Sequence, residues 1–117
     1  MEPIYDPRGQ VVAWLNGEDI YHLNGSHAGV VDGENVYGHS GQHLGVFTQG
    51  YFRDHAGGAV AFLSGAHGGP VLPIPATPPI PPMPAIPPIP AIPSIPPVPA
   101  IPSLSWSRMV WQEFINR

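Results

Sequence analysis

Histidine is the reactive residue that this chain concentrates, with six copies among 117 residues and no cysteine. His27 and His43 lie sixteen residues apart, and so do His39 and His55. Histidine pairs bind zinc where a fold brings them together. Neither spacing continues to a third histidine, however, and no cysteine joins the pairs. We therefore expect turn or surface histidines, with no metal site and no cofactor.

The acidic side chains offer less chemistry. Asp6, Asp32, Glu34 and Asp54 lie in or beside segments of turn composition, where aspartate commonly bonds to nearby backbone. Their spacing gives no reason to expect paired catalytic carboxylates, and the chain has no nucleophile elbow, phosphate loop or zinc-peptidase motif. We expect a protein that is not an enzyme, with no catalytic residues.

These residues belong to a sixteen-residue repeat that runs four times through residues 4–66 without an insertion. One column of the repeat is large and apolar, one is glycine and one is small. The columns are Ile4, Ile20, Val36 and Phe52; Gly9, Gly25, Gly41 and Gly57; and Ala13, Gly29, Gly45 and Ala61. Such self-similarity predicts copies of one small unit that bury their apolar faces together.

Each unit has the pattern of a β-hairpin, because two apolar runs flank a turn that ends in glycine. Asn16-Gly17 and Asp32-Gly33 then join one unit to the next as strong turn sequences. A single hairpin is marginal in water, so we expect all four to close around a pseudo-fourfold axis. The prediction is an all-β fold with few exposed edges, in which the small column lies near the axis.

A tyrosine column follows the large apolar one. Tyr5, Tyr21 and Tyr37 form a candidate ring for contact with an apolar or sugar ligand, although aromatic residues in strands are usually packing groups. The fourth unit departs from the pattern, because Arg53 stands where a fourth tyrosine would be.

The four-times-repeated plan of apolar-tyrosine, glycine, small-aromatic and glycine resembles the four-fold β-flower domain family over about residues 3–66. The resemblance implies four β-hairpin petals around a central axis, a mostly bacterial distribution and no established enzymatic activity. A likeness in shape to Tubby-like lipid-binding folds has suggested membrane or ligand binding for such proteins. The proline-rich segment that follows is expected to lie outside the match.

From Ile74 the period drops to three, with proline at every third place from Pro75 through Pro102. This spacing predicts a polyproline II helix over residues 70–104, called the tail below, because that helix has three residues per turn. Residues that precede the prolines then form one face, called the isoleucine row: Ile80, Met83, Ile86, Ile89, Ile92, Ile95, Val98 and Ile101. About 30 residues at ~3.1 Å each reach ~90 Å, against ~25 Å for a compact 66-residue domain, so we expect a rod that cannot lie wholly on its own domain.

The final segment, residues 105–117, has the pattern of a short amphipathic helix capped by Ser105 or Ser107. Such a short helix is weak alone, so we expect it to dock, on protein rather than on a bilayer, because only two arginines support a membrane surface. The predicted divisions are a β-flower domain at 1–69, the tail at 70–104 and this segment. Trp106, Trp111 and Phe114 are its candidate interaction residues.

Composition narrows the function further. The chain carries a formal charge of −4 and no lysine, which removes the main electrostatic term of nucleic-acid binding. No secretory signal is readable, so cytoplasmic residence is the default, with signal-independent export or membrane association left open. We expect an assembly or protein-interaction module whose isoleucine row self-associates or binds a partner. The alternatives are a plain spacer and a lipid- or membrane-binding protein with the flower as ligand-binding head.

Overall fold

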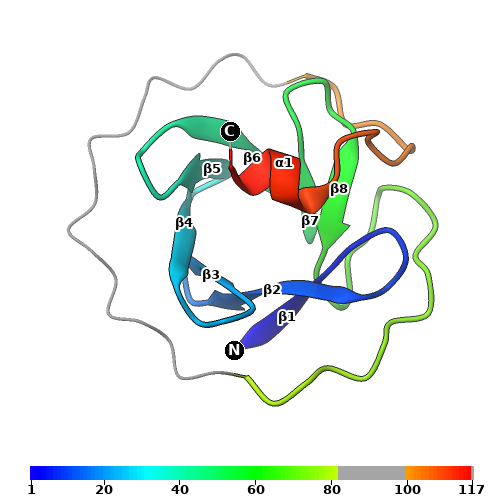
Figure 1. The fold of residues 1–117 in the computed structure, drawn as a ribbon. Helices are drawn as coiled ribbons and strands as arrows, with labels where there is room; N and C mark the ends of the chain where they lie inside the picture. The colour runs from blue at the N-terminus through cyan, green and yellow to red at the C-terminus, as the bar shows by residue number, and fades with distance from the viewer. Residues whose placement is uncertain (82–99, 117) are drawn as a thin grey trace.

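Eight antiparallel strands close into a barrel in which every strand pairs with its neighbours in sequence (Figure 1). The computed structural model describes residues 1–81 and 100–116. The strands are β1 (Glu2–Tyr5), β2 (Val11–Asn16), β3 (Asp19–His22), β4 (His27–Asp32), β5 (Asn35–Gly38), β6 (His43–Thr48), β7 (Tyr51–Arg53) and β8 (Ala59–Phe62). The prediction of four hairpins around a central axis is confirmed.

Each hairpin, called a petal, ends in the same five-residue turn. These petal turns are residues 6–10, 22–26, 38–42 and 54–58. In every one the first residue donates its N–H to the fifth residue's carbonyl at 2.9–3.0 Å, and the fourth residue, a glycine, donates to the first at 2.9–3.1 Å. The four glycines, Gly9, Gly25, Gly41 and Gly57, have φ of +83° to +91°, a conformation that costs glycine little. The glycine column is therefore set by this turn.

The small column lies opposite the large apolar column, and contacts on its other side limit the size of its glycines. Directly opposed residues are Ile4 and Ala13, Ile20 and Gly29, and the corresponding pairs Val36 with Gly45 and Phe52 with Ala61. A side chain added at Gly45 would meet the carbonyl of Arg53 and the ring of Phe114. At Gly45, therefore, the neighbouring strand and the C-terminal helix leave no room for a side chain.

The barrel closes at a narrow seam between β1 and β8, where one residue pair, Tyr5 and Phe62, is in register. The two rings stack with centroids 5.3 Å apart. The C-terminal chain supports this seam, since the Ala59 N–H donates to the Ser105 carbonyl at 3.2 Å and the Ser107 N–H donates to the Ala59 carbonyl at 2.7 Å. The last strand thus relies on residues that come after the tail.

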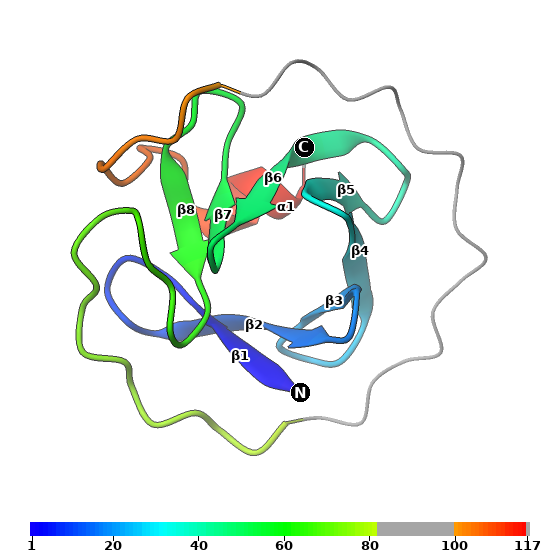
Figure 2. The same cartoon turned by 180° about the vertical axis from the view of Figure 1, so that it is seen from behind.

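One short helix, α1 (Trp111–Ile115), lies within the ring of strands in both views (Figure 2). Trp111 and Phe114 are 3% and 0% exposed and belong to the same core cluster as Ile4 and Leu44. The expected docking on protein is thus seen, and the protein is the chain's own barrel. The predicted serine caps are wrong, because Val110 is the N-cap and makes no side-chain capping bond.

Candidate functional site: the tail anchors

Arg53 ties both ends of the tail to the barrel. It is fully buried, at 0% exposure. Its Nη1 donates to the carbonyls of Gly57 and Ser103, each at 2.7 Å, and its Nη2 reaches the Gly68 carbonyl at 3.5 Å. Gly68 precedes the tail and Ser103 is close to its end. A single guanidinium therefore holds the point where the tail leaves the barrel and the point where it returns.

The charge on Arg53 survives this burial. Burial lowers the pKa of the guanidinium, while the nearby Tyr51 and Asp54 act in the opposite sense. The Tyr51 ring lies 5.2 Å from the guanidinium carbon, within cation–π range, and burial raises the pKa of its hydroxyl. That hydroxyl donates to the Pro70 carbonyl at 2.6 Å. Because arginine is protonated at any ordinary pH, the Arg53 guanidinium is cationic in the folded protein.

Backbone bonds fix the two described parts of the tail to petal turns. The Ala76 N–H donates to the Gly9 carbonyl at 2.7 Å, and the Ser103 N–H donates to the Gly57 carbonyl at 3.0 Å. We refer to these contacts as the tail anchors. Both ends of the predicted rod thus lie on the molecule's own barrel. Residues 82–99, which carry most of the isoleucine row, lie outside the described residues.

The described members of the isoleucine row face solvent. Ile80 is 94% exposed and Ile101 is 89% exposed, and Ile74, two steps of the period before the row, is 92% exposed. The remaining predicted members, Met83, Ile86, Ile89, Ile92, Ile95 and Val98, lie outside the described part of the chain. At both described ends, then, backbone hydrogen bonds hold the tail while its isoleucines are open to solvent, and near its start Leu72 packs against the barrel.

The C-terminal candidates behave differently from the row. Trp111 and Phe114 are buried in the barrel core, and the Trp106 ring contacts Tyr51 and Phe62 with centroids 6.1 and 5.9 Å away. All three predicted interaction residues therefore have partners within their own chain. Their aromatic surface stabilises the barrel.

The predicted tyrosine ring is also internal. Tyr5, Tyr21 and Tyr37 are 5%, 2% and 4% exposed. Tyr21 and Tyr37 each make an edge-to-face contact with a histidine, His27 and His43 respectively, and burial, followed by the charge of Asp19, raises the pKa of Tyr21. The column packs strands together, and little of each side chain is open to solvent.

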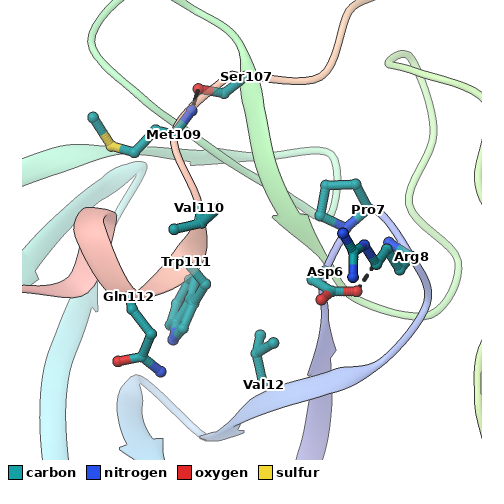
Figure 3. A pocket seen from close by; sticks show the side chains of 9 residues that line it. All are labelled: Asp6, Pro7, Arg8, Val12, Ser107, Met109, Val110, Trp111 and Gln112. Atoms are coloured by element: carbon teal, nitrogen blue, oxygen red, sulfur yellow. Dashed lines mark hydrogen bonds between the residues drawn. The ribbon is translucent and has the colours of Figure 1, made fainter.

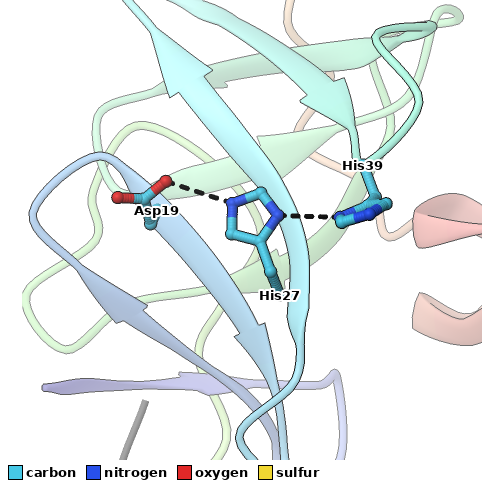
Figure 4. A network of polar contacts seen from close by, with 3 residues as sticks. All are labelled: Asp19, His27 and His39. Carbon is cyan, nitrogen blue, oxygen red and sulfur yellow. Dashed lines mark hydrogen bonds and ion pairs between the residues drawn. The ribbon is translucent and has the colours of Figure 1, made fainter. Parts of the chain in front are cut away.

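Histidines from the two sixteen-residue columns meet in mixed pairs. His27 Nδ1 lies 2.9 Å from His39 Nδ1, and His27 Nε2 lies 3.1 Å from Asp19 Oδ1 (Figure 4). One of the two imidazoles must donate and the other accept in the 2.9 Å contact. The chain of Asp19, His27 and His39 links β3, β4 and the third petal turn.

The same arrangement recurs one repeat further along. His43 Nε2 lies 3.0 Å from Asn35 Oδ1, and His43 Nδ1 lies 2.9 Å from His55 Nε2. The sequence suggested pairs within a column, whereas the fold pairs residues twelve apart because each petal turn lies beside the strand of the preceding petal. Within residues 1–81 and 100–116, no three histidine, aspartate or glutamate side chains are grouped so as to hold a metal ion.

A pocket of about 360 Å³ lies between the first petal and the returning C-terminal chain (Figure 3). Its lining residues are Asp6, Pro7, Arg8, Val12, Ser107, Met109, Val110, Trp111 and Gln112. The Trp111 indole N–H is buried and has no hydrogen-bond partner among the described residues. The volume is within the range of small-molecule sites, although none of the tyrosines predicted to contact a ligand lies in it.

The fold and the anchors define the class of protein: a closed barrel of four hairpin petals whose own C-terminal segments fill and bind it. The chain matches the family model described as the 4-fold beta flower protein over residues 2–115, and it belongs to that family. The match extends beyond residue 66, through the tail and α1, so these segments fall inside the family's extent. No curated protein and no solved structure was found to match the chain.

Proposed function

We propose that the protein is a non-catalytic assembly module whose tail presents the isoleucine row to other copies of the chain. The observation that supports this most is the contrast at the described ends of the tail. Ala76 and Ser103 are bound to petal turns through their backbone, while Ile80 and Ile101 are 94% and 89% exposed. A polyproline II helix separates its three columns onto three faces, so a tail held on one face displays another.

An exposed row of this kind has a large free energy to gain by association. Burying an isoleucine side chain contributes roughly 1.5–3 kcal/mol. Ordering costs are low because proline has already restricted the unbound backbone. Segment 70–105 contains no lysine or arginine whose charge would need to be desolvated. Contiguous apolar surface is the usual mark of an interaction site, which favours assembly over a plain spacer.

The test is the mass of the full chain in solution, measured by size-exclusion chromatography with light scattering over a concentration series. Truncation would be a poor control, because α1 supplies buried core residues. The better comparison is a row variant carrying Ile80→Gln, Ile89→Gln and Ile101→Gln against a control carrying Leu23→Gln and Val110→Gln. Leu23 and Val110 are exposed apolar residues outside the row.

We expect the wild-type chain and the control to rise above the 12.5 kDa monomer mass as concentration increases, and the row variant to remain monomeric. A wild-type chain that stays monomeric and soluble at high micromolar concentration would rule out self-assembly.

A lipid surface is the second candidate binding partner of the isoleucine row. Its support is the same uncharged apolar face, whereas Trp106 and Trp111 contact the chain's own barrel. The part of the chain described here contains no helix with the length and apolar character needed to cross a membrane. Flotation with neutral phosphatidylcholine vesicles tests the idea, since binding that is lost in the row variant and kept in the control would favour a lipid partner.

A further inference from the structure

The contact between His27 and His39 joins two petals through side chains that can each take up a proton. His27 is the first residue of β4 in the second petal, and His39 lies in the third petal turn. Their Nδ1 atoms are 2.9 Å apart and their ring centroids are 5.2 Å apart. The His27 side chain is 10% exposed, whereas His39 belongs to the exposed residues. Solvent therefore has direct access to one ring of the pair.

Asp19 determines which nitrogen of His27 carries a hydrogen. Its carboxylate can only accept, so His27 Nε2, which lies 3.1 Å from Asp19 Oδ1, donates to it (Figure 4). In a neutral imidazole the other nitrogen is an acceptor, so His27 Nδ1 accepts from His39 Nδ1. When both rings are neutral, the two hydrogen bonds therefore have one consistent direction, from His39 to His27 and from His27 to Asp19.

This arrangement tolerates one added proton but not two. With one proton added to His27, both of its nitrogens donate, one to Asp19 and one to His39, and its positive charge lies beside the carboxylate. With a second proton on His39, neither ring has an acceptor, because an imidazolium carries a hydrogen on both nitrogens. Two N–H groups would then face each other across 2.9 Å, and the two positive charges repel. The contact therefore fails when both rings are protonated.

The groups around the pair do not offset a second charge. Among the described residues, the titratable groups recorded against the two rings all belong to β3 and are Asp19, Tyr21 and His22. Asp19 bonds to His27, and the Tyr21 ring makes an edge-to-face contact with the same histidine. His22 adds charge of the same sign, since burial and then the charges of His27 and His39 lower its pKa. The carboxylate thus favours a charge on His27, and the neighbouring imidazoles oppose a charge on His39.

The same two positions one repeat earlier hold apolar residues. Val11 and Leu23 come sixteen residues before His27 and His39, and Val11, like His27, is the first residue of its strand. The second and third petal turns have the same two backbone bonds. The fold therefore does not require histidine at either position, which leaves the pair available for another role.

We propose that His27 and His39 form an acid-sensitive switch that connects the third petal turn to β4 at neutral pH and releases it when both rings are protonated. β4 and β5 stay paired along their backbones, so the release is limited to the turn and leaves the barrel closed. The switch belongs to the barrel itself, and it operates whether or not the isoleucine row binds another molecule.

NMR of the full chain, at a concentration where light scattering shows a monomer, tests the switch directly. The pH is lowered from 8.5 to 4.5, a range that brackets the ordinary histidine pKa of about 6.5, and the ring ¹⁵N shifts report the protonation of each histidine. We expect His39 to carry its hydrogen on Nδ1 at pH 8.5. We also expect the nuclear Overhauser cross-peak between the His27 and His39 rings to weaken at least fivefold once both are protonated.

Three results of this titration would overturn the proposal. The first is a hydrogen on His39 Nε2, with both rings neutral, at pH 8.5. The second is a ring cross-peak of unchanged intensity in the doubly protonated pair. The third is a pair that still holds only one added proton at pH 4.5.

A double variant, His27→Val with His39→Leu, is the matched control, because it places there the two residues that the chain itself carries one repeat earlier. The measurement is the protection of the Gly41 amide against exchange with solvent, since this N–H donates to the Gly38 carbonyl within the third petal turn. We expect this protection factor to fall at least fivefold between pH 7.5 and 4.5 in the wild-type chain, and less than twofold in the double variant. Equal falls in the two proteins would overturn the proposal.

His22→Gln separates the role of the pair from that of its neighbour. We expect this variant to keep the fall in Gly41 protection, because the His22 imidazole only adds charge beside the pair. A pH response that disappears in His22→Gln and persists in the double variant would assign the switch to His22 and overturn the proposal. Should the double variant fail to fold, the ring cross-peak of the wild-type chain decides alone.

Discussion

At the scale of single residues, the positions where the repeat is broken or constrained carry the most information. Arg53 replaces a fourth tyrosine, and this break in the column was the signal, visible in the sequence, for the residue that clamps the tail. Its partners could not be predicted, because the carbonyls of Ser103 and Gly68 reach it only through the path of the folded chain. The glycine column was predictable from turn chemistry, although its contact with the tail was not.

Arg53→Met should destabilise the barrel severely. The change removes the donor to the carbonyls of Gly57 and Ser103. The Gly57 carbonyl keeps its bond from the Ser103 N–H, but a buried acceptor that loses its partner costs ~1–3 kcal/mol, so we expect a loss of about 2 kcal/mol. Urea unfolding measures the loss, with Arg8→Met as control because Arg8 is exposed. A free energy of unfolding within about 0.5 kcal/mol of wild type, the usual range for surface changes, would contradict the proposed role of Arg53 in holding the tail.

Gly9→Ala and Gly57→Ala separate the cost of backbone strain from the cost of losing an anchor. Gly65 is the matched control, because its φ of +86° is close to the φ of Gly9 and Gly57, but a Cβ added at Gly65 would meet no other atom within 4 Å. We expect ~1 kcal/mol of destabilisation from Gly65→Ala, due to the left-handed conformation alone, and at least twice as much at the anchor glycines. Equal losses in thermal unfolding at all three positions would show that the tail contributes nothing at the anchors.

His22 gives the barrel a defined pH dependence. Burial, and then the charges of His27 and His39, lower the pKa of its imidazole, so the unfolded chain binds its proton more readily than the folded one. The contribution of His22 to the free energy of unfolding is therefore fully present above the pKa of about 6.5 that histidine has in the unfolded chain. It falls as the pH drops below that value and levels off below the lower pKa of the folded state. In urea unfolding between pH 7.5 and 5, His22→Gln should lose less stability than wild type; identical losses would contradict this assignment.

At the scale of elements, the sixteen-residue period predicted the petals and their closure, because register and turn chemistry are local properties of each unit. It could not predict which histidines meet, since His27 and His39 belong to different columns and their contact depends on how neighbouring petals pack. The C-terminal helix was predicted as an element, but its place within the ring depends on the size of the space that the strands leave. Its N-terminus was misplaced for a local reason, because Ser107 bonds instead to Asp54 and to the Met109 N–H.

Removal of the helix side chains should therefore damage the barrel itself. Phe114 is 0% exposed and packs on Trp111 with ring centroids 5.5 Å apart. We expect Phe114→Ala to cost ~3–5 kcal/mol, the usual range for a buried phenylalanine, with Gln112→Ala, an exposed position on the same helix, close to neutral. Loss of the near-ultraviolet circular dichroism of the aromatic core on heating provides the measurement. An unchanged melting temperature for Phe114→Ala would mean that α1 is not part of the core in solution.

At the scale of the whole molecule, the sequence predicts a conformation for the tail but says nothing about its location. A period of three with proline specifies polyproline II geometry from local sterics, and it says nothing about what the helix touches. The expectation of a projecting rod came from its length compared with a compact domain. The structure instead places both described ends of the tail on petal turns, joined by Arg53, with Ile74, Ile80 and Ile101 exposed to solvent.

Small-angle X-ray scattering of the full chain, extrapolated to zero concentration, tests most directly whether the tail is bound to its own barrel. The Cα radius of gyration of the structure is 13.1 Å, with a longest extent of 36 Å. We predict a radius of gyration within a few ångströms of this value and a maximum dimension below about 50 Å once side chains and hydration are included. A maximum dimension approaching the ~90 Å of a free polyproline II rod would contradict the account.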